Sequence, residues 1–145
     1  MRAGWVTLIA LVTMIACGGP ETIDPGPTQN IQDDFAGTDD SGALHVHVDF
    51  IQNGRNITLK SPCNPQDFCR MFPENPTGRI EIGDQFPVDI ATATGTFADP
   101  GITFTMTLTN GRTFTFTGNV VQSKQMIGTL SGATHPASRL QLDLQ

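Results

Sequence analysis

The regular alternation of apolar and polar residues constrains the fold of this chain more than any other feature of its sequence. It is clearest in LHVHVDFI at residues 44–51, in TFTMTL at 103–108 and in TFTFTGNV at 113–120. A period of two is typical of a strand that buries one face, whereas an amphipathic helix repeats every 3.6 residues. Glycine and asparagine separate the runs, so the sequence predicts an all-β domain.

Runs of this kind fill the chain from Gly42 to Gln145, with no convincing helical period between them. The expected strands are Leu44–Ile51, Asn56–Lys60, Arg79–Ile82, Val88–Phe97, Ile102–Leu108, Arg112–Val121, Met126–Ser131 and Arg139–Leu144. About eight short antiparallel strands are typical of a small up-and-down barrel. We therefore expect a single antiparallel meander closed into a small barrel, with a β-sandwich as the alternative fold.

Matching the apolar faces across a turn predicts the register of the first hairpin. Asn53–Gly54 has the residue types that favour a two-residue hairpin turn. Such a turn pairs Phe50 with Ile57. Two residues further from the turn it pairs Val48 with Leu59, so the apolar side chains share one face.

A similar dipeptide later in the chain predicts a longer loop. A two-residue turn at Asn110–Gly111 would set every apolar residue against a threonine. A three-residue loop over Thr109–Gly111 instead pairs Phe104 with Phe116. Because a slip by one residue turns a whole strand face over, we expect the longer loop, with Gly111 in the left-handed region.

The strand before this hairpin indicates how the interior is filled. Through a tight turn it sets Gly95 opposite Phe104, and it sets Ala91 opposite Leu108. Small residues that face large ones suit a curved, filled barrel better than a barrel with a wide ligand cavity.

The first seventeen residues have the organisation of an export signal. Arg2 supplies a positive start, and an apolar run follows over Trp5–Ala16. The run is about twelve residues long, and a membrane-spanning helix needs roughly 20. Met14–Cys17, at its end, resembles the lipobox of bacterial lipoproteins, so residues 1–16 are predicted to be a signal peptide. An ordinary secretory signal, cut at another site, is the alternative.

The lipoprotein resemblance implies that the thiol of Cys17 carries lipid, palmitate included, and that Cys17 becomes the mature N-terminus. Gly18 follows the cysteine, and by the same resemblance it points to the outer membrane rather than the inner one. More than one acyl chain is sufficient for stable anchoring in a bilayer. The expected location is thus the cell envelope, with a membrane contact through the N-terminal lipid.

Residues 17–41 are predicted to be the lipidated cysteine and a disordered acidic linker. Between residues 18 and 41 the chain carries three prolines and six acidic residues, without Lys or Arg. This composition cannot bury enough apolar surface to order itself. The β-domain is therefore expected over residues 42–145. It is nearly neutral although the chain has a net charge of −6, so we expect no nucleic-acid partner.

The chain has three cysteines, and Cys63 and Cys69 remain once lipid has modified Cys17. An even remainder in an oxidising compartment predicts a disulfide between them. Two free thiols are the alternative. A zinc site at this pair would need two further ligands, and the spacing is not a usual one.

Few residues suggest chemistry beyond the anchor. His45 and His47 alternate on one strand face and are the only candidates for a shared metal, against the simpler interpretation of a solvated face. We expect no metal and no other cofactor. No nucleophile-and-base motif is present, so we expect no enzyme activity. Phe68, Phe72 and Phe86 mark the region where a contact surface is expected.

Two functions remain open from the sequence. The first is a membrane-anchored envelope lipoprotein with a non-enzymatic structural or protein-interaction role. The second is a lipocalin-like barrel, by fold analogy alone, that carries a small apolar ligand. A carrier needs an internal cavity of roughly 300 Å³ or more, whereas a structural barrel is filled by its own side chains.

Overall fold

The structure is a computed structural model, and it describes residues 26–60, 78–83, 85–132 and 135–145. The described chain is built from nine strands in one antiparallel sheet. They are β1 (Asp34–Thr38), β2 (Leu44–Asn53), β3 (Asn56–Leu59), β4 (Gly78–Ile82), β5 (Val88–Ala98), β6 (Gly101–Leu108), β7 (Thr113–Val121), β8 (Gln125–Gly132) and β9 (His135–Leu144). Among these residues, no helix has the length and apolar character needed to span a membrane.

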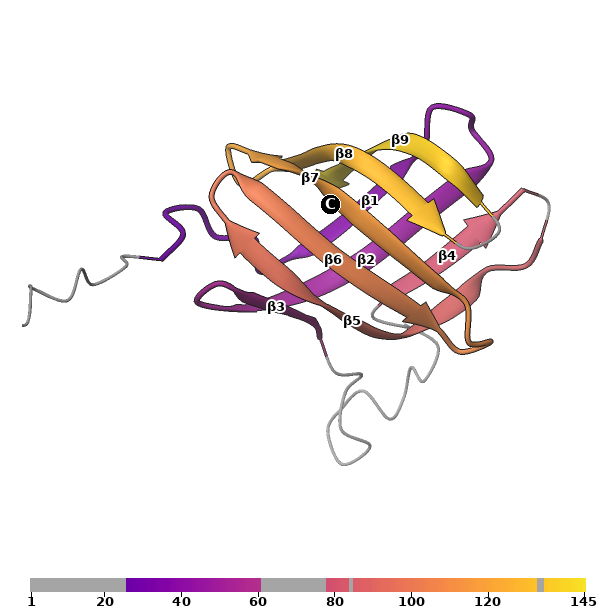
Figure 1. The fold of residues 1–145 in the computed structure, drawn as a ribbon, viewed down its shortest axis with the longest axis horizontal. Coiled ribbons are helices and arrows are strands. Elements are labelled where there is room, and N and C mark those ends of the chain that lie inside the picture. The colour runs from indigo at the N-terminus through magenta and orange to yellow at the C-terminus, as the bar shows by residue number, and fades with distance from the viewer. Residues whose placement is uncertain (1–25, 61–77, 84, 133–134) are drawn as a thin grey trace, which may run out of the picture.

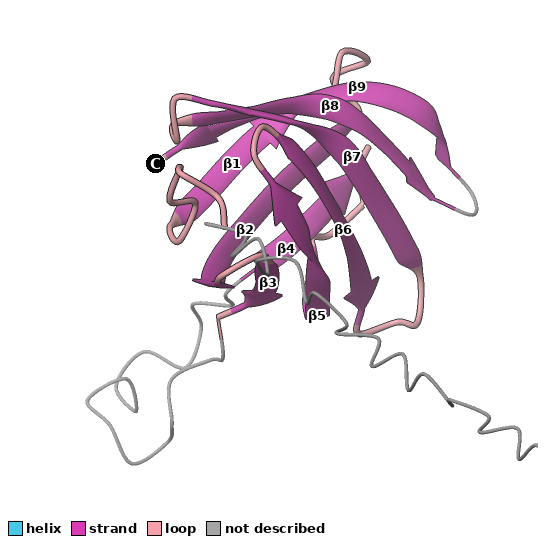
Figure 2. Cartoon of the chain, turned by 60° about the vertical axis from the view of Figure 1, so that its left-hand side comes forward, coloured by secondary structure: helices cyan, strands magenta, loops and turns pink. Residues whose placement is uncertain are grey.

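The sheet closes into an eight-stranded barrel with β4 as an additional strand. Closure depends on β1, which pairs with β2 along one edge and with β9 along the other. Figures 1 and 2 both show β8 and β9 on one side of the barrel, with β3 and β5 on the other. The predicted all-β barrel is confirmed, and a single closed sheet replaces the β-sandwich alternative.

Strands β3 and β4 share one position in the barrel wall. The amide of Lys60, just after β3, donates to the carbonyl of Asp49 at 2.9 Å. The next position on β2 is Val48, and Gly78 at the start of β4 pairs with it. Lys60 and Gly78 therefore lie at neighbouring points of the same wall.

The barrel interior is occupied by side chains from opposite walls. The rings of Phe50 on β2 and Phe104 on β6 meet edge to face, with centroids 4.8 Å apart. The ring of Phe104 also stacks on Phe116 of β7 at 5.0 Å. All three side chains are at most 1% exposed. Full burial of such a side chain is worth about 1.5–3 kcal/mol, so these contacts across the barrel are a main source of stability.

The predicted register of the β6–β7 hairpin is confirmed. Phe104 pairs with Phe116, and Met106 pairs with Phe114. The loop residue Gly111 has a φ of 82°, in the left-handed region. Matching two apolar faces was therefore sufficient to select the three-residue loop.

The predicted register of the β2–β3 hairpin is wrong by two residues. The turn residues are Gly54 and Arg55, since Asn53 pairs with Asn56 and Phe50 pairs with Leu59. Gly54 has a φ of 58°, and a glycine at the first central position suits a type II′ turn. A shift of two residues keeps every side chain on its face, so apolar matching could not exclude it.

The pairing of Ala91 with Leu108 is also wrong. Ile90 pairs with Leu108, and the register shifts between Ile90 and Thr92. Ala91 is the extra residue of this irregularity, which bends β5 where the barrel curves. Gly95 lies opposite Phe104 as expected, and a Cβ there would come within 2.6 Å of the Phe104 Cα.

The predicted start of the β-domain at Gly42 also has to be corrected, because the fold begins inside the expected linker. Ile31 and Phe35 are fully buried, and Asp34–Thr38 forms β1. The strand is short and its polar residues face outward, so the average composition of residues 18–41 does not indicate it. Its backbone is paired along both edges, which fixes it despite the nearby acids.

Candidate functional site

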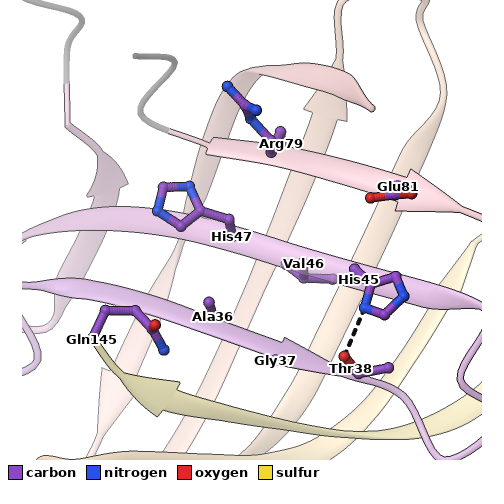
Figure 3. A pocket seen from close by; sticks show the side chains of 9 residues that line it. All are labelled: Ala36, Gly37, Thr38, His45, Val46, His47, Arg79, Glu81 and Gln145. Carbon is purple, nitrogen blue, oxygen red and sulfur yellow. Dashed lines mark hydrogen bonds between the residues drawn. The ribbon is translucent and has the colours of Figure 1, made fainter. Parts of the chain in front are cut away.

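An open hollow of about 370 Å³ lies on the outer surface of the barrel, where β1, β2 and β4 run side by side. Figure 3 shows it from close by, with its polar side chains around the rim. Its lining residues are Ala36, Gly37, Thr38, His45, Val46, His47, Arg79, Glu81 and Gln145.

Strand pairing explains why these residues meet. On β2, His47 lies between Arg79 of β4 and Ala36 of β1. Because the side chain of Ala36 is small, it leaves open space in the hollow beside the imidazole ring of His47. Gly37 is the next residue of the lining, and it is required there because a Cβ would lie 1.8 Å from the Gln141 carbonyl oxygen. The crossing of β1 over β9 therefore shapes the hollow.

The two histidines have separate partners. His47 Nε2 lies 2.7 Å from Asp34 Oδ1, and His45 Nδ1 lies 2.7 Å from the Thr38 hydroxyl. Figure 3 shows the two imidazole rings turned away from each other. Among the described residues, no group of three His, Cys, Asp or Glu side chains is placed to hold a metal ion. Alternation thus brings His45 and His47 to one face of the strand, but their ring nitrogens do not point toward a common position.

Arg79 and Glu81 contribute opposite charges to the rim. Both are half-buried, and within the described ranges neither side chain takes part in a hydrogen bond or an ion pair. A guanidinium group has five donors arranged for planar acceptors such as carboxylates. The hollow therefore offers an incoming group an unused donor set and an unused acceptor.

A second polar cluster lies at the end of the barrel, around Asp39. The carboxylate is only 4% exposed. Its Oδ1 accepts hydrogen bonds from the amides of Ala43 at 3.1 Å and Leu44 at 3.0 Å. Its Oδ2 accepts a bond of 2.7 Å from the hydroxyl of Ser41. These contacts close the turn between β1 and β2, so Asp39 is a turn-forming residue of the fold and not a linker acid.

His135, at the start of β9, faces the same carboxylate. Its Nε2 lies 3.6 Å from Asp39 Oδ2 and 3.2 Å from the Ser138 hydroxyl. A Ser-His-Asp triad needs the acid and the serine on different ring nitrogens. Here one nitrogen faces both groups, so this arrangement joins β9 to the β1–β2 turn without the geometry of a nucleophile and its base.

The surroundings of Asp39 act on its acidity in opposite directions. Burial raises the pKa of the carboxyl group, whereas hydrogen bonds from Ser41, Leu44 and Ser138 and the charge of His135 lower it. The lowering effects prevail, and the pKa lies below its ordinary value of 3.8. The fold therefore stabilises the ionised form of this buried group.

Several predicted site residues lie outside the described residues. They are the lipidation site Cys17, the cysteine pair Cys63 and Cys69, and the aromatic residues Phe68 and Phe72. Phe86, the third aromatic residue of the expected contact region, lies between β4 and β5 with 92% of its side chain exposed. The hollow itself was not predicted, since no sequence signal indicates that β4 lies beside β2.

No protein-family model matches this chain, and no curated protein matches it. The interpretation of its function therefore depends on the sequence of the N-terminal segment and on the geometry described above.

Proposed function

We propose that this protein is a membrane-anchored envelope lipoprotein with a non-enzymatic role in protein interaction. In this proposal the lipid on Cys17 holds the protein at the outer membrane. The barrel supports a contact surface on its outer wall, and its interior takes no cargo.

The occupied interior is the observation that carries this proposal. Phe50 and Phe104 touch across the barrel with ring centroids 4.8 Å apart, in the space that a lipocalin-like carrier would keep for a ligand. Phe116 fills the neighbouring volume at 5.0 Å from Phe104. The hollow of about 370 Å³ has a suitable size for a ligand, but it is open, polar and on the outside. This arrangement favours an interaction module over the alternative carrier of an apolar ligand.

The rim of the hollow supports a protein partner with a carboxylate side chain. Arg79 can donate two parallel hydrogen bonds to one carboxylate, which is the strongest ordinary form of such a contact. His47, whose Nε2 lies 2.7 Å from Asp34 Oδ1, is the neighbour of the incoming group on β2. Glu81 would repel a second carboxylate on its side of the hollow, so the partner's acid is expected beside Arg79.

Cell fractionation tests the anchor. We expect the wild-type protein and a Cys63→Ser control to pellet with membranes, and a Cys17→Ser variant to remain in the soluble fraction. The control removes a thiol that the proposal assigns to the domain. Membrane recovery of Cys17→Ser equal to that of the wild type would contradict the anchor.

Photo-crosslinking in intact cells tests the contact surface. A photoreactive residue at Thr38, on the rim of the hollow, is expected to crosslink to one protein, whereas the same residue at Thr103 on β6 is not. Adding Arg79→Ala should remove the Thr38 crosslink. A crosslink pattern that is the same at both positions, or insensitive to Arg79, would contradict the assignment of the hollow.

A further inference from the structure

The segment Thr28–Ile31, which we call the N-terminal strap, is fastened across one end of the barrel. The hydroxyl of Thr28 and the side-chain amide of Gln29 both donate to the carboxylate of Asp99, the latter at 2.6 Å. The side-chain oxygen of Gln29 accepts a hydrogen bond from the amide of Ser123 at 2.7 Å. The strap is thereby joined to the turns that follow β5 and β7.

Ile31 completes this fastening from the inside. Its side chain is fully buried, and its amide donates to the side-chain oxygen of Gln52 at 2.8 Å. The amide group of Gln52 in turn donates to the carbonyls of Gln29 and Gly54. The strap therefore also holds the β2–β3 turn, and Figure 1 shows all three turns at the left-hand end of the barrel.

The strap changes the length of chain that is free between the lipid and the barrel. If Cys17 carries the lipid, only about ten residues separate it from Thr28. Such a segment has a root-mean-square span of roughly 16–19 Å and a fully extended limit of about 35 Å. Composition alone predicts a linker that reaches Ser41. The shorter connection starts from one defined end of the barrel.

The opposite end lies a full strand length away. β5 has 11 residues, which at about 3.3 Å each and a tilt of about 40° gives a barrel height of roughly 25 Å. Phe86 lies at that far end, in the connection that leads into β5. A connection of about ten residues places the strapped end nearer to the bilayer than the end with Phe86.

We propose that the strapped end of the barrel faces the lipid bilayer, and that the end bearing Phe86 faces away from it. This orientation depends on the proposed lipidation of Cys17. The surface that meets the bilayer includes Ile51 and Val121, which are 38% and 41% exposed and lie beside the β2–β3 and β7–β8 turns. Partly exposed aliphatic side chains at a membrane boundary gain from burial among headgroups.

Electrostatics has little part in this orientation. The strapped end carries Arg55 and Lys124 in its turns, and it also carries Asp33, Asp99 and Asp143, which pairs with Gln125 beside the β7–β8 turn. Each basic residue near an anionic leaflet contributes about 1 kcal/mol, and the acids at this end offset that attraction. We therefore expect the orientation to persist at high ionic strength, because the length of the connection determines it.

Tryptophan fluorescence tests the orientation in the intact lipoprotein. The chain contains one tryptophan, Trp5, and no tyrosine, and Trp5 lies in the predicted signal peptide. Val121→Trp and Phe86→Trp then form a matched pair of single-tryptophan proteins at the two ends, both at exposed apolar positions. The probe is a phosphatidylcholine vesicle that contains dansyl-labelled phosphatidylethanolamine. We expect energy transfer to the dansyl headgroup to be at least twofold more efficient from Val121→Trp.

Equal transfer from both variants, or stronger transfer from Phe86→Trp, would overturn the orientation while leaving the anchor in place. Vesicle flotation reports the anchor separately, since a protein that fails to float refutes lipidation and with it this proposal. In a further pair of variants, each of the two tryptophan proteins carries about twenty additional Gly and Ser residues after Pro20. The insertion increases the root-mean-square span of the connection to roughly 30 Å. The difference between the two tryptophan positions should then decrease, and an unchanged difference would show that the connection does not set the orientation.

Discussion

The inner and outer surfaces of the barrel wall are made by the same strands, yet they follow different physical rules. On β2, the inward residue Phe50 is 1% exposed and contacts Phe104 across the barrel. The outward residue His47 on the same strand contacts Asp34 and borders an open hollow. The inner surface is determined by volume and apolar contact, whereas the outer surface leaves charged groups such as Arg79 without partners in the described structure. Stability and function are therefore expected to respond to different substitutions.

The largest difference is expected at Phe104. Phe104→Ala removes a ring that contacts both Phe50 and Phe116, and truncations of this kind cost about 3–5 kcal/mol. The control is Thr103→Ala, on the exposed face of the same strand, which should stay within about 0.5 kcal/mol. Urea unfolding measures both free energies. A loss at Phe104 that matches the loss at Thr103 would mean that the interior is not packed as described.

Ile31 extends the same comparison to the strap. Ile31→Ala should lower the free energy of unfolding by about 2–4 kcal/mol, since the side chain is fully buried. Ile51→Ala is the matched control, because Ile51 is 38% exposed, and it should cost less than about 1 kcal/mol. If truncating Ile31 had no effect in thermal or urea unfolding, the residues before β1 would not belong to the folded domain.

Asp39 is the polar exception among buried side chains. Asp39→Ala leaves the amides of Ala43 and Leu44 without their acceptor, at a cost of about 1–3 kcal/mol. Asp40→Ala alters the exposed neighbouring acid and should be close to neutral. Chemical denaturation at pH 7 compares the two variants, and equal stabilities would argue against the turn that Asp39 closes.

The same carboxylate predicts a dependence on pH. The pKa of Asp39 is lower in the folded state than its ordinary value of 3.8. The contribution of its ionised carboxylate to folding stability is therefore complete at pH values above 3.8. It is lost as the pH falls through the folded-state pKa, because the unfolded state then binds the proton more readily. Asp39→Asn should therefore lose less stability than the wild type between pH 5 and pH 2.5. Parallel stability curves for the two proteins would contradict the stabilised carboxylate.

The smallest effect on stability is expected at the rim of the hollow. Arg79→Ala should change the free energy of unfolding by less than about 0.5 kcal/mol, because the guanidinium has no partner in the described structure. The same substitution should abolish the proposed contact with a protein partner. A large loss of stability from Arg79→Ala would show that the outer surface also maintains the fold.

Particular residues explain how much of this structure the sequence predicts. The inward positions Phe104 and Phe116 follow from alternation, and their pairing follows because any shift by one residue would expose them. The same reasoning did not determine the pairing of Phe50, because a shift of register by two residues leaves every side chain on its own face of the sheet. Composition concealed β1, because its short alternation lies among acids and glycines.

The candidate site is less predictable than the fold. His45 and His47 are adjacent on one face for a simple periodic reason, but Arg79 joins them only because β4 continues the wall begun by β3. That arrangement depends on a pairing between distant segments, and no local pattern in either strand specifies it. Residues of the inner surface can be recognised in the sequence by their periodicity. Residues of the outer site are brought together by topology alone, so the sequence does not mark them.

The proposed function depends most on the interior being occupied by the protein's own side chains. Native mass spectrometry of the protein purified from membranes, followed by solvent extraction, measures this directly. We predict the mass of the chain from residue 17 with its covalent lipid, no additional molecule, and no saturable binding of a fluorescent fatty acid. An apolar compound that co-purifies at one equivalent and is displaced by that fatty acid would contradict the filled barrel and favour a carrier.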